Sequence, residues 1–349
     1  MVFAVTFPGL ACFPCADFTL VFQMLLYFFR RILYLIPILV GVNLLVFAMF
    51  FVVNTPDDMA RQALGEKADR PEAIEVWKAN HGYDMPLFFD GASSGVGKFT
   101  HTIFFRRSLG MFWGDFGVSD ATGKAIISEI RARVWPSFAL ALPIFIGTLL
   151  ANVYFAMKLA ALRGSAVDRA GQFLCVLLMS TSTLVFIIFG QYIGAQKLRL
   201  APVSGFATGL AMAKFLTLPA VVGIISGLGS GTRLYRTFFL EQISQDYVRT
   251  ARAKGLSEDT VLFKHVLRNA LIPILTNIPI YLLMLFTGNL LLEKFFAIPG
   301  LGGFTIDAIA AQDFSVVRAM VFLGAVLYIF GMLLADLAYT IADPRVKLE

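Results

Sequence analysis

The sequence predicts an all-α membrane protein with about six transmembrane helices, and its composition and hydropathy are the observations that predict this. Hydrophobic residues make up 58% of the 349 residues and charged residues only 15%. Soluble domains average roughly 45–50% apolar and about 25% charged residues, so both values depart toward the membrane. The mean hydropathy of +0.76 agrees. A soluble chain this apolar could not cover its own surface with polar groups.

Long apolar stretches give the position of each predicted transmembrane helix. A helix that crosses a bilayer needs about 20 mostly apolar residues. The stretches that meet this requirement cover approximately residues 28–53, 136–159, 171–196, 210–228, 270–292 and 316–341. The fourth is rich in glycine and weaker than the others, but it is long enough to span.

The parts of the chain outside these helices suggest its domain organisation. Residues 1–23 lack the basic n-region of a signal peptide, and we expect the working chain to begin near Met24. The segment 54–135, called here the insertion, is too long and too organised for a simple connection. The predicted division is an N-terminal extension at 1–23, a first helix at 24–53, an extracytoplasmic insertion at 54–135 and a transmembrane core at 136–349, with a charged loop at 229–269.

The distribution of basic residues predicts the orientation in the membrane. Lys and Arg gather at Arg30 and Arg31, in the 158–169 link, in the 229–269 loop and in the tail. Short loops rich in Lys and Arg stay in the cytoplasm. Both termini are therefore expected to be cytoplasmic and the insertion extracytoplasmic. The net charge of +6 reflects this bias, and no basic run indicates a nucleic-acid partner.

The charged loop contains a segment, residues 246–268, that predicts two helices joined by a tight turn; we call it the elbow. Basic side chains precede Gly255, which suits the left-handed position just past a helix end. Ser257 is placed to cap the second helix, with Glu258 and Asp259 in its first turn. A basic elbow of this kind could lie on lipid headgroups or dock into a groove of a cytoplasmic partner.

The apolar residues of the elbow predict that it is amphipathic. Leu256 and Val261 are spaced as a hydrophobic staple across the helix start. In the second helix, one apolar side is expected to contain Leu262, Phe263, Val266 and Leu267.

The stretch Tyr247–Pro273, YVRTARAKGLSEDTVLFKHVLRNALIP, closely resembles the cytoplasmic signature loop of binding-protein-dependent ABC importer permeases. The general motif of that superfamily is Glu-Ala-Ala, three residues, then Gly. This chain has Arg249-Thr250-Ala251 at the first three positions and retains Gly255. It has His265-Val266-Leu267-Arg268 in place of the usual Ile-x-Leu-Pro ending. Both departures resemble the variant of the peptide/nickel-type branch, which carries oligopeptides and dipeptides.

Other segments resemble the same branch, so the resemblance covers most of the chain from about residue 28. They are the opening helix at Arg30–Gly41, the run Trp113-Gly114-Asp115-Phe116-Gly117, the turn Pro299-Gly300-Leu301-Gly302 and the closing Asp343-Pro344-Arg345. The insertion is longer than in the simplest members of the branch.

The resemblance implies the type I ABC importer permease fold in a bacterial inner membrane, with lipid around it. It implies two related permeases forming the pathway, two cytoplasmic ATPase subunits, and an extracytoplasmic substrate-binding protein that delivers the cargo. Peptides are the expected cargo. The residues implied to couple the ATPase to transport are Tyr247, Arg249, Thr250, Ala251, Arg252, Ala253, Gly255, Ser257 and His265.

The resemblance also implies a transport subunit without catalytic residues or a cofactor of its own. ATP and Mg would be bound by the partner ATPase, in agreement with the absence of a GxxxxGK[ST] phosphate loop from the sequence. The histidines, His81, His101 and His265, show no metal-ligand spacing. Acidic residues inside a membrane span, such as Asp336, are functional candidates by default. Asp336 lies near the end of the last predicted span, and this position favours a hydrogen-bonding role for its carboxylate.

Two other function classes stay open from the sequence. A secondary transporter driven by an ion gradient should show paired membrane-embedded acids and internal repeats. A membrane-bound transferase should place clustered acids, a histidine or a nucleophile at the membrane surface. Few such features are visible, and we expect neither class.

Overall fold

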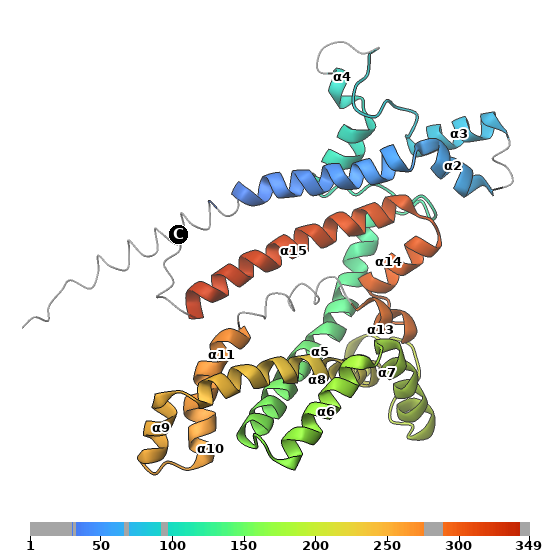
Figure 1. The fold of residues 1–349 in the computed structure, drawn as a ribbon. Coiled ribbons are helices and arrows are strands. Elements are labelled where there is room, and N and C mark those ends of the chain that lie inside the picture. The colour runs from blue at the N-terminus through green and yellow to red at the C-terminus, as the bar shows by residue number, and fades with distance from the viewer. Residues whose placement is uncertain (1–29, 31–32, 66–69, 92–96, 276–288, 343–349) are drawn as a thin grey trace, which may run out of the picture.

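The structure is a computed structural model that describes residues 30, 33–65, 70–91, 97–275 and 289–342 (Figure 1). This part of the chain is helical with one isolated β-bridge, between Val118 and Ala125, and the predicted all-α membrane class is confirmed. The helices long and apolar enough to cross a membrane are Leu33–Val53, α5 (Ile126–Ala161), α8 (Met212–Ile243) and the Phe314–Leu334 part of α15 (Phe314–Ala342). Together, α6 (Ala166–Ser180) and Thr183–Lys197, which begins with α7 (Thr183–Gly190), pass the same test.

Shorter helices connect these long ones. They are α2 (Pro56–Leu64), α3 (Pro71–His81), α4 (Gly97–Thr100), α9 (Asp246–Ala253), α10 (Glu258–Thr260), α11 (Leu267–Leu275), α13 (Leu290–Phe295) and α14 (Leu301–Ala310). Tighter or wider helical turns cover Ala48–Val53, Phe104–Ser108, Leu109–Trp113, Gln191–Lys197, Gly209–Ala211 and Val261–Val266. The predicted extension at 1–23, most of the predicted span 270–292 and the closing tail lie outside the described residues.

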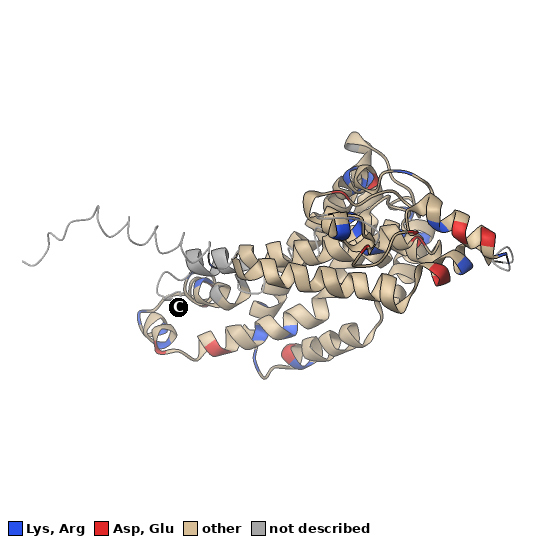
Figure 2. Cartoon of the chain, turned by 90° about the horizontal axis from the view of Figure 1, so that it is seen from above, with Lys and Arg blue, Asp and Glu red and all other residues tan. Residues whose placement is uncertain are grey.

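Helix boundaries differ from the hydropathy prediction in a consistent way. The second span begins at Ile126 instead of residue 136, and α8 continues to Ile243, past the predicted end at 228. Both helices extend beyond their apolar part into helical turns that contain charged, helix-favouring residues, and hydropathy does not detect these polar turns. Figure 2 shows the same pattern, since the long helices are mostly uncharged and the charged residues gather toward their ends.

The third predicted span is broken. Its two halves, α6 and Thr183–Lys197, are bent by 95° relative to one another. Ser182 begins the second half, because its side chain accepts a hydrogen bond from the Leu184 N–H at 3.4 Å. A prediction based on apolar length alone joins the two halves, because no proline or glycine stands at the break.

The centre of the bundle is the contact between α5 and α8. Glycines at every fourth position of α8, Gly223, Gly227 and Gly231, face α5. A Cβ atom on the first two would lie 2.7 Å from Ile144 and 2.8 Å from Thr148, and on the third it would overlap the Asn152 amide. Small residues at this spacing let two membrane helices approach closely. The glycines that weaken the hydropathy of the fourth span therefore serve its packing.

A polar side chain joins the same two helices inside their apolar length. Asn152 is buried on α5, and its Nδ2 donates to the Gly227 carbonyl at 3.3 Å. Its Oδ1 accepts from the Thr232 hydroxyl at 2.8 Å. Both side-chain groups of Asn152 are thus bonded to α8, as a polar side chain in an apolar span requires.

Part of the insertion lies along the membrane helices. Asn43 in the first helix donates from Nδ2 to the Ser108 carbonyl at 3.1 Å. The ring of Phe112 packs against Phe322 of α15, with centroids 5.3 Å apart. Asn43 lies on the order of 15 Å from the helix end at Val53, at about 1.5 Å per residue. The segment Phe104–Gly117 therefore extends well down the sides of the first and last helices.

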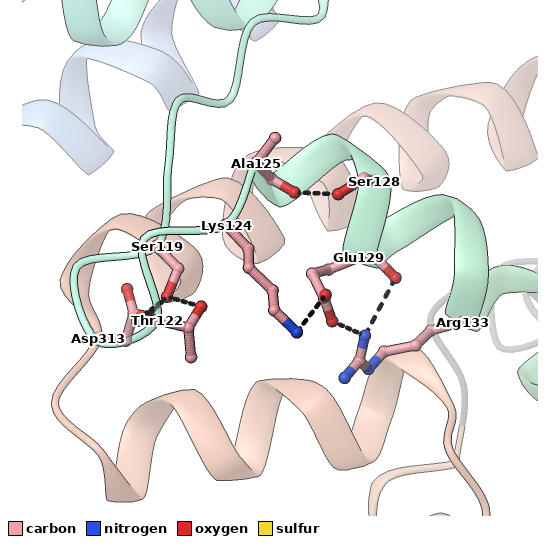
Figure 3. A network of polar contacts seen from close by, with 8 residues as sticks. All are labelled: Ser119, Thr122, Lys124, Ala125, Ser128, Glu129, Arg133 and Asp313. Carbon is pink, nitrogen blue, oxygen red and sulfur yellow. Dashed lines mark hydrogen bonds and ion pairs between the residues drawn. The ribbon is translucent and has the colours of Figure 1, made fainter.

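The insertion is also fastened where α14 meets α15 (Figure 3). The carboxylate of Asp313 accepts hydrogen bonds from the Ser119 hydroxyl and from the N–H groups of Asp120 at 3.2 Å and Ala121 at 3.3 Å. In return, the Asp120 carboxylate accepts from the Ser315 N–H at 2.9 Å. These reciprocal bonds tie the turn before α5 to the start of α15.

Candidate functional site

The elbow has the helix–turn–helix form that the sequence predicts. α9 ends before Gly255, whose φ is +74°, in the left-handed region. The Gly255 N–H donates to the Arg252 carbonyl at 2.9 Å, and the Leu256 N–H donates to the Ala251 carbonyl at 3.4 Å. These bonds satisfy the last carbonyls of α9 in a turn that other residues adopt only with strain. The left-handed conformation expected for Gly255 is therefore observed.

The second helix starts with the expected cap and with an ion pair. The Ser257 side chain accepts from the Thr260 N–H at 3.4 Å. Arg252 donates from Nε to Glu258 Oε1 at 2.8 Å and from Nη2 to Oε2 at 3.2 Å. This bidentate pair bridges the two arms of the elbow. Both side chains are exposed, so the pair orients the arms more than it stabilises the fold.

The inner side of the elbow belongs to the core of the bundle. Val248 is fully buried and Ala251 is nearly so. Together with Val261, Leu262 and Val266 they join one apolar cluster, which also contains Ala156, Met157 and Ala160 of α5 and Tyr235 and Phe239 of α8. A displacement of the elbow must therefore displace the ends of α5 and α8, because close-packed side chains do not slide freely.

The predicted coupling residues divide into three groups by exposure. The exposed ones are Arg249, Thr250, Arg252, Ala253, Gly255 and Ser257. Tyr247 and His265 are half-buried, and Ala251 packs inside. Ala251 therefore belongs to the permease's own core, whereas the exposed residues present a surface. Their contact with an ATPase stays a prediction.

The apolar residues of the second helix differ in their burial. Leu262 and Val266 are buried, whereas Phe263 is 49% exposed; across the helix start, Leu256 is exposed and Val261 is buried. Residues Val261–Val266 form a π-helical turn, in which the repeat is longer than in an α-helix. The buried side of this turn consists of Val261, Leu262 and Val266.

The outer side of the elbow combines exposed apolar and basic side chains. Leu256 and Phe263 are exposed, and so are Arg249, Lys254 and Lys264. An amphipathic surface of this kind suits a groove with an apolar floor and an acidic rim.

An ion pair between a buried aspartate and a half-buried arginine, which the sequence analysis treated only as loop charge, lies at the same end of the bundle. Asp168 in the first turn of α6 is 2% exposed. It accepts from Arg236 on α8, with Nε–Oδ1 at 2.9 Å and Nη2–Oδ2 at 2.8 Å. It also accepts from the Gly164 N–H at 3.0 Å and from Gln172 at 3.1 Å. Ser165 caps α6, and the Ser-x-x-Asp pattern was the available sequence signal for a helix start here.

Glu293 anchors the opposite end of the bundle. It is fully buried and accepts hydrogen bonds from the Ser137 hydroxyl at 2.8 Å and from the Gly303 N–H at 3.0 Å. Burial raises the pKa of Glu293. A Cβ atom on Gly300 would overlap its carboxyl group and lie 2.5 Å from Ser137 Oγ. The Pro299–Gly302 turn therefore needs glycine because this carboxylate sits at the start of α14.

Arg318 on α15 is a second buried charge that the sequence analysis missed. The residue is 2% exposed, and its guanidinium lies 5.0 Å from the centre of the Phe51 ring. A lone arginine within an apolar run was the signal that could have found it. The side chain of Asp336, another predicted candidate, lies outside the described residues.

Long apolar helices, a basic elbow packed against their ends and a buried carboxylate at the far end define a multi-pass helical membrane protein. Residues 144–348 match the family described as "Binding-protein-dependent transport system inner membrane component". Residues 24–141 match the N-terminal part of such membrane components. The chain belongs to this family and is a permease subunit of an ABC importer in the inner membrane, as its resemblance predicted.

Curated relatives match over nearly their whole length. The glutathione transport system permease protein GsiC of Pectobacterium atrosepticum is 33% identical over 325 residues, 93% of this chain and 99% of the relative. The proteins of the same name from Salmonella paratyphi A and Escherichia coli O1:K1 are 32% and 30% identical, with the same coverage.

Proposed function

We propose that this permease forms half of a translocation pathway for short peptides, beside a second homologous permease. Its relatives are named for glutathione transport, and glutathione is a tripeptide. Two separate ATPase subunits would bind ATP and Mg, and a binding protein would deliver the peptide to the outer face. This chain needs no cofactor of its own in that scheme.

The proposed orientation places both termini and the elbow in the cytoplasm. The elbow and the 158–169 link carry most of the basic residues of the short loops, in agreement with the positive-inside bias. The Asp168–Arg236 pair supports the same placement, because it joins this link to the elbow end of α8. The insertion then lies on the outer side, where a binding protein can reach it.

One observation carries the coupling role of the elbow: its inner side and the ends of α5 and α8 form a single buried cluster. ATPase closure would push on the exposed side, at Arg249, Leu256 and Phe263. α8 is continuous from Met212 to Ile243, which at about 1.5 Å per residue spans roughly 48 Å. A push at one end of this helix would therefore be felt near the other side of the membrane, and alternating access would follow.

The test replaces Gly255 by valine and measures uptake of a labelled tripeptide by the reconstituted complex. Gly255 has open space around its Cα, so the expected damage is confined to the turn. We expect uptake to be lost while the chain is still inserted and assembled. Gly65→Val is the matched control, because Gly65 also has a positive φ, of +55°, and open space, but lies in the insertion. Normal uptake with Gly255→Val would refute the coupling role.

The same preparation separates the proposed function from its alternative. Tripeptide uptake that requires ATP and co-purified ATPase subunits supports the importer. Uptake by this chain alone, driven by an ion gradient, would instead identify a secondary transporter.

A further inference from the structure

A large cavity opens between the first helix and the segment Phe104–Gly117. Its volume is about 950 Å³, within the roughly 300–1,000 Å³ typical of small-molecule sites. Ile36 and Val40 of the first helix line one side of it. Phe105, Phe112 and Trp113 line the facing segment. The cavity is thus mainly apolar and aromatic, and it is large enough for a short peptide.

Charged groups line the same cavity well down the membrane helices. Arg106 and Asp115 are lining residues and both are exposed. The neighbouring Ser108 is bonded to Asn43, on the order of 15 Å from the end of the first helix at about 1.5 Å per residue. A charged side chain facing hydrocarbon at the bilayer centre costs about 2.5–3.5 kcal/mol, and such residues face water-filled cavities instead. We therefore interpret this cavity as filled by water.

The two arginines at the cavity are held differently. Arg107 donates to the His81 carbonyl, and its guanidinium lies 5.5 Å from the centre of the Tyr83 ring. Arg106 forms no ion pair with any residue that the structure describes. Within the described part of the chain, the Asp115 carboxylate accepts a bond from the Gly117 N–H at 3.0 Å. Arg106 and Asp115 thus offer one cationic and one anionic group, beside the 88% exposed indole of Trp113.

We propose that this cavity binds the transported peptide in its zwitterionic form. The peptide carboxylate would pair with Arg106, its ammonium group with Asp115, and its side chains would pack against the aromatic side of the cavity. The inference rests on the proposed function and adds a site within this chain. Acyl chains of lipid fit the aromatic wall, but they leave both charges without a partner.

Trp113 is a built-in reporter for the test. Trp77→Phe and Trp135→Phe leave Trp113 as the only tryptophan of this chain, and tryptophans of the companion subunits are replaced likewise. The assembled complex is placed in nanodiscs of brominated phosphatidylcholine and titrated with trialanine. We expect weak quenching by the lipid and a saturable change of Trp113 emission with the peptide.

Variants and peptide derivatives identify the charged contacts. Arg106→Gln should weaken trialanine binding about tenfold, the effect expected from losing a hydrogen bond to a charged group. Trialanine amide, which lacks the carboxylate, should bind the unmodified site equally weakly and should lose nothing further with Arg106→Gln. Asp115→Asn should likewise weaken trialanine binding. N-acetyl-trialanine, which lacks the ammonium group, should bind the unmodified site weakly and should lose nothing further with Asp115→Asn. Arg61→Gln, an exposed arginine of α2, is the control and should change nothing.

Several outcomes would overturn the proposal, and one separates it from the proposed function. Strong quenching by brominated lipid would show a lipid-filled groove, and emission insensitive to both lipid and peptide would show a surface covered by a companion subunit. If Arg106→Gln weakens the binding of trialanine and of its amide equally, Arg106 does not contact the peptide carboxylate. If the complex transports tripeptide while Trp113 does not respond, only the cavity assignment fails. If it transports no peptide, the proposed function fails.

Discussion

Replacing Gly231 by alanine perturbs the contact between α5 and α8 at a point where the structure has no spare room. The new methyl group would overlap Nδ2 of Asn152 and lie 2.6 Å from its Cγ. Asn152 is a short, buried side chain, so it must leave its position and lose its bonds to Gly227 and Thr232. Overpacking costs about 1–3 kcal/mol, and each interhelical bond in a membrane about 0.6 kcal/mol. The expected destabilisation is therefore about 2–4 kcal/mol.

A second substitution shows whether the loss arises from this contact. Asn152→Ala removes the atoms that clash, so in the double variant the alanine methyl group at position 231 can use the vacated space. We expect the double variant to be more stable than the sum of the two single losses by about 1–3 kcal/mol. The assay is reversible unfolding of the purified protein in mixed micelles of a mild detergent and SDS. Gly324→Ala is the control, because a Cβ atom there meets nothing within 4 Å.

The result that refutes this reasoning is additivity. If the two losses add within about 0.5 kcal/mol, Asn152 does not occupy the space next to Gly231. A Gly231→Ala protein as stable as the parent would show that α5 and α8 are not in close contact at this level.

Two further predictions concern the buried carboxylates. Asp168→Ala leaves the half-buried Arg236 without its partner and should destabilise by about 1.5–3 kcal/mol in the same unfolding assay; removing both charges as Asp168→Leu with Arg236→Met should cost less, and an equal loss would contradict the pairing. Burial raises the pKa of Glu293 above the ordinary value of about 4.3 for glutamate, so the folded state favours its protonated form. Its contribution to stability is therefore greatest below about pH 4.3 and is lost as the pH rises through the raised pKa. Thermal unfolding against pH should show this fall, and Glu293→Gln should remove it.

The features that the sequence predicted well depend on neighbours along the chain. Apolar length shows where a helix can span, whereas the orientation drawn from the basic residues stays a prediction. The turn at Gly255 and the cap at Ser257 are local, because their bonds reach residues no more than a few positions away. Such features follow from residue type and spacing, before any tertiary contact forms.

The features that the sequence did not predict depend on distant partners. Arg236 and Asp168 stand 68 residues apart, and each alone looks like an ordinary charge of a basic loop. The four-residue spacing of the α8 glycines was visible, but nothing in it identifies α5 as the partner. The π-helical turn at Val261–Val266 was not predicted either, and within it Phe263 is exposed while Leu262 and Val266 are buried.

The distribution of strong and weak contacts also limits how the permease can move. α5 and α8 are joined by the buried Asn152 bonds, and α6 is joined to α8 by the Asp168–Arg236 pair. Breaking that pair alone would cost about 1.5–3 kcal/mol, whereas the exposed Arg252–Glu258 pair of the elbow stabilises by less than about 1 kcal/mol. Motion passed on by the elbow should therefore tilt α5, α6 and α8 as one body. The bend between α6 and α7 does not free α7 from this body, because Ile187 of α7 packs in one buried cluster with Leu218 and Val222 of α8.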